Sequence, residues 1–470
     1  MKAHVLTSHS EKPYSYWIKK NWYYHALIAS LYRSFIPEQS RVLHMRCKNG
    51  VLLAAVKPSF GVGIDEDHSC IAEAQLQYQE YQFITGDFKN LSLDQSLHKK
   101  FDYIMINLAT MESDDVQMLF ETIHAVSHES TKVVIDFYSC LWEPVLWLTQ
   151  KLSLRRPTEF KNWLSLHDIS NFLSLADCEI VTKDRYILIP CYIPLFSWLV
   201  NSFIAPLPVI NRLCLSNLIV ARPVPKKLNK QDYSVSVIIP CRNERGNIEA
   251  AVKRCPVMGK KTEIIFVEGH SKDNTLEEIK RVCALYPEKN ISYYVQQGKG
   301  KGDAVRLGFE RAAGDVLMIL DADLTVAPEE LPKFYNALLD GKGEFINGSR
   351  LVYGMESEAM RFLNLIANYC FGIGFSWLLG QPIKDTLCGT KVLFKTTYEK
   401  IVANRSFFGE FDPFGDFDLL FGAAKLNLKI VDMPIRYKNR NYGTTQISRF
   451  RHGFLLLCMS FVALKKFKFK

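Results

Sequence analysis

Short apolar runs alternate with segments of helical spacing along most of the chain. Five such runs precede residue 221, and the same rhythm begins again after residue 232. Strands that alternate with helices predict parallel sheets covered by helices on both faces. The predicted strands are Arg41–Met45, Gly61–Asp65, Tyr81–Thr85, Phe101–Leu108, Lys132–Tyr138, Val235–Pro240, Glu263–Glu268, Ile291–Val295 and Asp315–Asp323.

The stretch Ala221–Asp232 interrupts this rhythm. It contains two prolines and four basic residues without apolar periodicity, as is typical of a solvated connector. A chain of 470 residues also exceeds what one hydrophobic core usually serves. We therefore predict two doubly wound α/β domains, residues 1–222 and 233–470, joined by a basic linker at residues 223–232.

Composition and charge narrow the function classes. The formal charge of +9 is too small for this length to indicate a nucleic-acid partner, and we expect none. The 12 cysteines form no CxxC pair and no metal-ligand spacing. The N-terminus lacks the continuous apolar core of a signal peptide. These features predict a cytoplasmic protein.

Two apolar segments suggest contact with a membrane surface. Phe454–Leu464 is followed by lysines and is far too short to span a bilayer, so it fits either an interfacial helix or a core helix with a basic end. Ile187–Ile210 contains four prolines, which forbid a regular spanning helix. It could cap its domain, pack on the neighbouring domain or enter a membrane interface. We expect a peripheral protein at the inner face of the membrane.

Asp321 and Asp323 directly follow an apolar run. Two carboxylates at positions i and i+2 of a strand end point the same way and can share one hard cation. Ligands of open α/β sheets collect at the carboxyl ends of strands. A divalent ion there, Mg²⁺ or Mn²⁺, would neutralise the charge on a departing diphosphate. The alternative is two solvated aspartates in a turn.

Other predicted strands deliver polar groups to the same edge. Pro240–Glu244 ends the first strand after the linker, and Glu268–Ser271 ends the next. Gly298–Gly302 precedes a helix, so that its lysines and free backbone N–H groups face the same rim. Several successive strand ends with such groups predict one anion-binding site.

This ordered series, continued by Asn347–Arg350, resembles family-2 glycosyltransferases with the GT-A fold, of the dolichol-phosphate or polyprenyl-phosphate sugar transferase type. The resemblance covers nearly all of residues 233–470. It implies a nucleotide-sugar donor, a lipid-phosphate or glycan acceptor, and inversion at the anomeric carbon. It places Pro240, Arg242, Glu244 and Glu268 at the nucleoside, Asp321 and Asp323 on the metal, and Lys301 near the phosphates. Glu268 stands where the family usually has aspartate.

The resemblance also assigns later segments. Arg350 corresponds to the arginine that meets an anionic acceptor or the diphosphate. Asp416 is the first candidate for the general base that an inverting transferase needs, and Asp385 is the second; either could instead orient the substrate. Arg440 begins a segment expected to close over the diphosphate. A surface loop with an incidental arginine is the alternative for Arg440.

The order of elements from Arg41 to about Pro223 resembles class I methyltransferases that bind S-adenosylmethionine. Their first strand leads into a glycine-rich turn, of which His44–Gly50 keeps only Gly50. Asp65 and Asp87 stand where acidic residues would bind the ribose and lie beside the adenine. Three hypotheses follow: an active methyltransferase, a domain with altered cofactor affinity, and a catalytically inactive scaffold, which we favour.

The sequence as a whole therefore predicts a metal-dependent glycosyltransferase with a methyltransferase-like N-terminal domain. The alternatives are a bifunctional enzyme in which both sites are active, and a non-catalytic scaffold associated with membranes.

Overall fold

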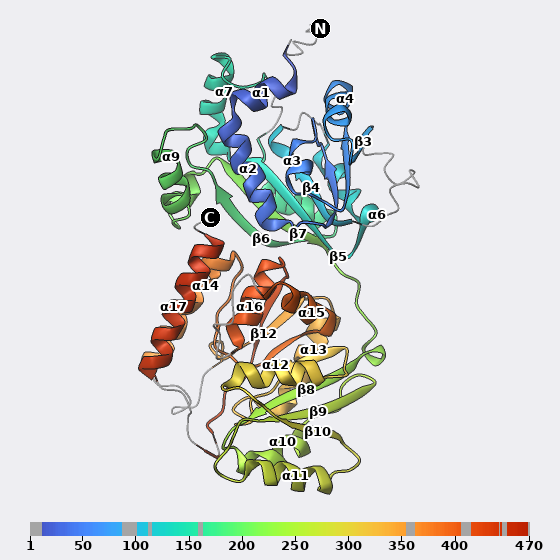
Figure 1. Ribbon diagram of the computed structural model, residues 1–470, viewed down its shortest axis with the longest axis vertical. Helices are drawn as coiled ribbons and strands as arrows, with labels where there is room; N and C mark the ends of the chain where they lie inside the picture. The colour runs from blue at the N-terminus through green and yellow to red at the C-terminus, as the bar shows by residue number, and fades with distance from the viewer. Residues whose placement is uncertain are drawn as a thin grey trace. The chain divides into compact units, whose positions relative to one another are not determined.

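The computed structural model describes residues 12–86, 101–110, 115–157, 163–353, 362–405, 415–440, 442–443 and 449–468. The chain forms two compact units, Met1–Pro225 and Lys226–Lys468. Each unit contains a mixed sheet of seven strands, and Figure 1 shows their helices and strands. The predicted fold class, two doubly wound α/β domains, is confirmed.

The N-terminal sheet has the strand order β3-β2-β1-β4-β5-β7-β6, and β7 runs antiparallel to both of its neighbours. Its strands are β1 (Arg41–Met45), β2 (Phe60–Asp65), β3 (Gln82–Thr85), β4 (Phe101–Asn107), β5 (Ser127–Tyr138), β6 (Cys178–Tyr186) and β7 (Ser216–Pro223). Its helices are α1 (Tyr14–Lys20), α2 (Trp22–Phe35), α3 (Val51–Ala55), α4 (His68–Gln77), α5 (Val116–Glu121), α6 (Ile123–Val126), α7 (Glu143–Lys151), α8 (Leu166–Leu175) and α9 (Phe196–Leu199).

The C-terminal sheet has the order β10-β9-β8-β11-β13-β12-β14, and β13 is its antiparallel strand. Its strands are β8 (Ser234–Cys241), β9 (Lys261–Glu268), β10 (Asn290–Val295), β11 (Val316–Ile319), β12 (Phe345–Ser349), β13 (Lys391–Phe394) and β14 (Ile430–Pro434). Its helices are α10 (Ile248–Arg254), α11 (Thr275–Leu285), α12 (Lys301–Arg311), α13 (Leu331–Leu339), α14 (Phe362–Leu379), α15 (Lys395–Ala403), α16 (Asp416–Lys425) and α17 (Arg449–Phe467).

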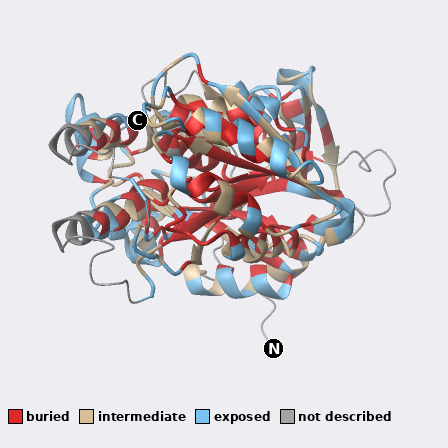
Figure 2. Cartoon of the chain, turned by 90° about the horizontal axis from the view of Figure 1, so that it is seen from below, coloured by how far each residue is buried: buried red, intermediate tan, exposed pale blue. Residues whose placement is uncertain are grey.

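Alternating side chains of each central strand enter separate cores on the two faces of the sheet. In β8, Val237 and Ile239 pack toward α10, α11 and α13, whereas Ile238 packs toward α12, α14 and α16. In β1, Leu43 packs into the core on one face of the sheet, and Val42 packs into the core on the other face. Strands buried on both faces read as continuous apolar runs, which is why the sequence reveals them. Figure 2 shows these strands as buried and the outer faces of the helices as exposed.

Two sequence-based boundaries differ from the structure. The strand β7 continues through Ala221 and Arg222 to Pro223, all buried, so the charged Arg222 belongs to a strand. Arg222 is tolerated there because it pairs with Glu179 of β6 at 2.7 Å. The predicted strand Asp315–Asp323 is shorter, since β11 ends at Ile319 and a hydrogen bond from Leu324 N to Asp321 O closes a turn.

Gly259 lies just before β9, at a position where a side chain has no room. Its φ is +63°, and a Cβ there would overlap the Tyr233 carbonyl oxygen. We expect Gly259→Ala to lower the free energy of unfolding by about 2–4 kcal/mol, from strain plus overlap. Gly374→Ala in α14 is the control, because nothing lies within 4 Å of its added Cβ. Urea unfolding of both variants should show loss only for Gly259→Ala.

Candidate active site

Charged groups from four parallel strands meet at one edge of the C-terminal sheet. The ends of β8, β9, β11 and β12 lead to Glu244, Glu268, Asp321 and Arg350 respectively. The antiparallel β13 lies between β11 and β12, so these two strands point the same way. The order of strands thus brings together residues that are up to a hundred positions apart in the sequence.

Asp321 pairs with Lys301, the first residue of α12. The distance from Lys301 Nζ to Asp321 Oδ1 is 2.5 Å, and both side chains are about a quarter exposed. Burial opposes ionisation of this carboxyl group, but Lys301, with help from Arg350 and Lys391, holds its pKa below the ordinary value. Asp321 is therefore an ionised carboxylate whose counter-charge comes from the glycine-rich segment.

Asp323 pairs with a different cation, Arg440. Arg440 Nη2 lies 2.5 Å from Asp323 Oδ2, and its Nη1 donates to Glu244 Oε1 at 3.4 Å. Thr325 also donates to Asp323 Oδ1, from its backbone N at 3.1 Å and its hydroxyl at 2.8 Å. Arg440 thus joins the end of β8 to the turn after β11.

The expectation that both carboxylates project from a strand end was wrong. Both aspartates lie in the turn after β11, and each one faces a separate cation of the chain. Within the described residues, no group of three or more His, Cys, Asp or Glu side chains is placed to hold a metal ion. Any cation here would need oxygen ligands from a substrate or water in addition to the two aspartates.

Gly389 allows the segment after Asp385 to pack against this pair. A Cβ at Gly389 would collide with Asp321 Oδ2 and Lys301 Nζ. The backbone of residues 385–389 therefore forms one wall beside the Asp321–Lys301 pair. The sequence contains a glycine at position 389, but only the structure shows that it packs against Asp321 and Lys301.

Asp385 holds Arg350. The guanidinium group donates two bonds to the carboxylate, Nε to Oδ2 at 2.7 Å and Nη2 to Oδ1 at 2.8 Å, and Arg350 N donates at 3.0 Å. Asp385 is fully buried, yet Arg350 keeps its pKa below the ordinary value against the effect of burial. These bonds fix the Arg350 side chain, which also lies 5.3 Å from the Tyr437 ring centroid.

Asp416 begins α16, but its side chain lies outside the described residues. The preceding Gly415 has a φ of +74°, and a Cβ there would lie 2.7 Å from Gly302 Cα. The start of α16 therefore abuts the start of α12, next to Lys301. Asp418, two residues further along α16, pairs with Arg405 at 2.9 Å.

The residues expected at the nucleoside occupy the ends of β8 and β9. Pro240 is half-buried in β8, and Arg242 is exposed beyond it. Glu268 is buried and accepts a hydrogen bond from Ser271 N at 2.5 Å. Glu244 accepts from Asn247 Nδ2 at 2.7 Å. Glu268 thus holds the turn after β9, and Arg242 remains open to solvent.

Sequence reasoning missed two contributors. Tyr442 covers Gly246, where a Cβ would lie 2.5 Å from the ring, and its hydroxyl donates to Asp273 at 3.3 Å. Lys391 is fully buried and donates to Asn347 Oδ1 at 3.2 Å and to the Cys388 carbonyl at 2.5 Å. The sequence signal for Lys391 was a lysine directly before the apolar residues 392–394.

The turn after β1 in the N-terminal unit takes left-handed conformations at residues other than glycine. Arg46 and Lys48 have φ values of +62° and +50°, and Gly50 has +75°. The left-handed region suits glycine, so two non-glycine residues here carry strain. Arg46 is held by two bonds to Glu66, at 2.8 and 2.9 Å. Asp87 lies outside the described residues.

The residues present do not fit S-adenosylmethionine. Asp65 is fully buried, and its oxygens accept from Lys48 N at 2.9 Å and Asp67 N at 3.0 Å. It is therefore not presented to a ribose. His44 is buried, neither ring nitrogen has a partner, and burial lowers its pKa to about 4, so it is neutral. The cavity beside this turn holds about 20 Å³, whereas cofactor pockets typically measure some 300–1,000 Å³.

Comparisons with known proteins match each of the two units to a different family model. Residues 236–406 match the family model of Glycosyl transferase family 2, and residues 27–189 match that of Methionine biosynthesis protein MetW. A dolichol-phosphate mannosyltransferase of Pyrococcus furiosus is 34% identical over 218 residues, which are 45% of this chain and 59% of that protein. An undecaprenyl-phosphate 4-deoxy-4-formamido-L-arabinose transferase of Aeromonas hydrophila is 33% identical over 119 residues, 24% of this chain and 36% of that protein. The chain thus spans less than two thirds of the length of these curated relatives.

Solved structures are similar to each unit. Glucosyl-3-phosphoglycerate synthase of Mycobacterium tuberculosis, with Mn²⁺, UDP and glucosyl-3-phosphoglycerate, is 17% identical with a TM-score of 0.37, covering 51% of this chain and 81% of that one. A TehB-like SAM-dependent methyltransferase of Corynebacterium glutamicum is 15% identical with a TM-score of 0.28, covering 44% of this chain and 95% of that one.

Glu244 makes stability depend on pH. Burial raises its pKa from 4.5 to about 7, although Asn247 and Arg440 oppose this. The folded chain therefore retains a proton that the unfolded chain releases between these values, so stability contributed by the neutral form is lost as pH rises through the window. We expect Glu244→Gln, which stays neutral, to gain thermal stability relative to the parent from about pH 5 to about pH 7 and to hold this gain above it.

The control for that measurement is Glu277→Gln, at an exposed position of α11. It reports the effect of removing one negative charge from the same unit. If the two variants follow the same pH profile, the burial of Glu244 is not the cause of the dependence.

Proposed function

Because residues 236–406 form a glycosyl transferase family 2 domain, we propose that the C-terminal unit transfers a sugar from a nucleoside-diphosphate sugar to an acceptor. The supporting observation is the set of alternating charges at the strand ends. Asp321 and Asp323 face Lys301 and Arg440, with Glu244 beside them. A diphosphate can bind to the cations of this set, and a divalent metal ion can bind to its carboxylates.

Lys301 and Arg440 each hold one of the two carboxylates. A diphosphate offers both cations a new partner, with bidentate geometry for the guanidinium group. Asp321 and Asp323 can then hold Mg²⁺ or Mn²⁺, because Mg²⁺ is usually bound by one or two carboxylates together with substrate phosphates and water. The ion would supply Lewis-acid stabilisation of the departing diphosphate.

The donor's nucleoside is assigned to the ends of β8 and β9. Glu244 and Glu268 are buried there and Arg242 is exposed, so carboxylate and guanidinium groups line one end of the site. The segment around Tyr442 packs over Gly246 at that end. Arg440, two residues earlier, reaches Asp323. A closed segment of this kind would exclude water from the transferring sugar.

The acceptor is proposed to be a polyprenyl phosphate, as in the names of both curated relatives. A phosphate acceptor is already ionised and needs little base catalysis. Arg350, fixed by Asp385, is the counter-charge that we assign to it. Asp385 is then a positioning residue, since Arg350 and backbone N–H groups occupy its oxygens. Asp416, at the start of α16, remains the candidate base for a hydroxyl acceptor.

A lipid acceptor requires contact with a membrane surface, and α14 and α17 supply a suitable face. They pack together, and both expose apolar side chains: Ile373 is 72% exposed, Leu457 59% and Phe461 68%. Lys465 and Lys466 follow in the last turn of α17. Among the described helices, none is long and apolar enough to cross a bilayer. We propose peripheral binding through this face.

The N-terminal unit is proposed to be a scaffold that does not methylate. The inward-facing Asp65, the neutral His44 and the small cavity beside them support this role. The retained turn supports descent from a cofactor-binding domain rather than present binding.

The metal proposal is tested by the two aspartates. We expect Asp323→Asn and Asp321→Asn each to lower kcat/KM about 100-fold or more, because each removes one of the two carboxylates that hold the ion. The measurement is release of nucleoside diphosphate from a panel of nucleotide sugars with undecaprenyl phosphate, with Mn²⁺ and with chelator. Asp340→Asn, beyond α13 and paired with Lys230, is the control. Parental turnover by Asp323→Asn would remove the metal assignment.

The scaffold proposal is tested by calorimetry with S-adenosylmethionine. We expect no heat of binding at high micromolar cofactor, because Asp65 is enclosed and the cavity beside it is too small for a nucleoside. Hydrogen exchange of the same protein sample must show protected amides in β1, β2 and β4, which establishes that the N-terminal unit is folded. Saturable heat with a stoichiometry near one would overturn the scaffold role.

A further inference from the structure

The N-terminal unit contains a second, much larger cavity of about 370 Å³. Residues of α1 and α2 form one side, the end of β5 forms the base, and α7 with residues 154–156 and 190–192 forms the rest. Its volume lies in the range of binding sites for small molecules. Seven of its lining residues are aromatic: Tyr14, Trp17, Trp22, Tyr23, Tyr24, Tyr138 and Tyr192.

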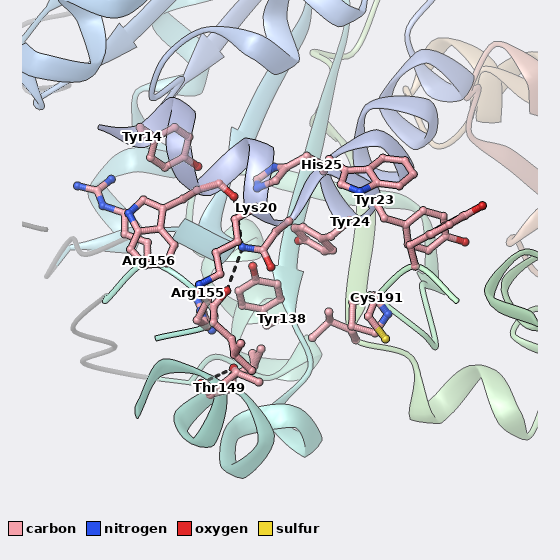
Figure 3. Close-up of a pocket in the computed structure, with 18 of the residues that line it drawn as sticks. Tyr14, Lys20, Tyr23, Tyr24, His25, Tyr138, Thr149, Arg155, Arg156 and Cys191 are labelled. Carbon is pink, nitrogen blue, oxygen red and sulfur yellow. Dashed lines mark hydrogen bonds between the residues drawn. The ribbon is translucent and has the colours of Figure 1, made fainter. Parts of the chain in front are cut away.

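The charged lining residues of this cavity are all basic. They are Lys20, Lys48, Arg155 and Arg156, and the lining residues in the described part of the chain include no Asp or Glu. Figure 3 shows Lys20, Arg155 and Arg156 on one side of the cavity, with Tyr23 and Cys191 on the other and Tyr24 and Tyr138 between them. One end therefore attracts an anion, and the opposite end is apolar.

The basic end is held in place by neighbouring groups. Lys20 Nζ donates to the Ser153 carbonyl at 2.7 Å, and Arg156 lies 3.5 Å from Asp67. The guanidinium group of Arg155 stands 5.4 Å from the Tyr138 ring centroid. Lys48, the fourth lining cation, lies 3.7 Å from Asp65, and neither Asp65 nor Asp67 lines the cavity.

Two exposed aromatic side chains lie at the apolar end of the cavity. Trp22 is 51% exposed and Tyr192 is 55% exposed, and their ring centroids are 5.1 Å apart. Tyr23 packs on Tyr192 at 5.5 Å. Tyr192 lines the cavity and is also exposed, so the cavity reaches the surface at this residue, which we call its mouth.

Around this mouth lies a face of exposed apolar side chains, which we call the apolar face. Its members come from α7 and from residues 192–213, two segments joined by a hydrogen bond from Trp142 Nε1 to the Leu213 carbonyl at 2.8 Å. Each member is between 40% and 79% exposed: Val145, Trp147, Leu148, Leu152, Tyr192, Ile193, Leu195, Phe196, Trp198, Leu199, Phe203, Ile204, Leu207, Val209 and Leu213. Soluble monomers rarely expose so many neighbouring apolar side chains.

The charges on and beside the apolar face are complementary to an anionic surface. Residues 188–213 contain no acidic residue and one basic residue, Arg212, and Lys151 ends α7. Glu143 is the acidic residue of α7, at its far end. Aromatic rings mixed with leucines, and bordered by lysine and arginine, are typical of segments that lie in the interface of an anionic bilayer.

We infer that this cavity and the apolar face together form a binding site for an anionic lipid at a membrane surface. The lipid's phosphate meets Lys20, Arg155 and Arg156, and its hydrocarbon chain leaves past Trp22 and Tyr192 along the apolar face. This site lies wholly within residues 14–215. It is separate from the α14–α17 face, and it does not depend on sugar transfer.

The test compares vesicles of phosphatidylcholine with vesicles that also contain about a third phosphatidylglycerol. Every protein in this test is the full chain with Phe461→Ser, so that vesicle binding through α17 is weakened. We expect anionic vesicles to slow hydrogen exchange in α7 and residues 192–207. We expect the added changes Phe196→Ser and Trp198→Ser to weaken vesicle binding about ten-fold, since two aromatic anchors are lost. Leu76→Ser, at a 79% exposed position of α4, is the matched control.

A second variant pair addresses the cavity. Arg155→Gln with Arg156→Gln should remove the preference for anionic over neutral vesicles while thermal unfolding still shows a folded unit. Release of nucleoside diphosphate, measured without vesicles, should stay at the parental rate in the Phe196→Ser, Trp198→Ser variant, so failure here is distinct from failure of the transferase proposal.

Two results would overturn the inference. One is vesicle binding by the Phe196→Ser, Trp198→Ser variant that equals binding by the Leu76→Ser control. The other is exchange in α7 and residues 192–207 that is already slow without vesicles, which would mean that protein covers the apolar face.

Discussion

The pairing of two carboxylates with two cations organises the C-terminal unit. Asp321 with Lys301, and Asp323 with Arg440, connect the turn after β11 to the start of α12 and to the segment beyond β14. Partly buried charges without partners are costly, so these contacts hold the surrounding loops at the rim of the sheet. Gly389 and Gly415 contribute by leaving room for close approach. A site held by ion pairs can exchange them for a charged substrate at little net electrostatic cost.

The N-terminal unit has a doubly wound sheet, and its own side chains occupy the turn after β1. The turn after β1 still takes left-handed conformations at Arg46 and Lys48. Asp65 satisfies the backbone N–H groups of that turn from inside the unit. The strain of two non-glycine residues is offset locally by the bonds of Arg46 to Glu66 and of Lys48 to Asp65. The larger aromatic cavity is lined in part by Lys48 of this turn, so the two cavities are neighbours.

Both units present apolar side chains to solvent beside basic residues. In the C-terminal unit they lie on α14 and α17, and in the N-terminal unit on α7 and residues 192–213. The two faces belong to different units, so each can be weakened without touching the charged rim.

The sequence determined the strands that are buried on both faces, since β1, β2, β8 and β9 each contain a short apolar run bounded by polar turns. It also indicated that charged groups follow β8, β9 and β11. The tertiary structure decided the rest. The predicted rhythm did not include β6, β7, β12, β13 and β14, because polar or charged residues such as Asn347, Arg222 and Lys391 lie in these strands and gain partners from other segments. The partner of each charge is decided in the same way: Arg440 meets Asp323, and Asp385 is occupied by Arg350. The aromatic cavity joins Trp22 to Tyr192. Local pattern reports burial along one strand, whereas ion pairs and cavities depend on which strands and helices become neighbours.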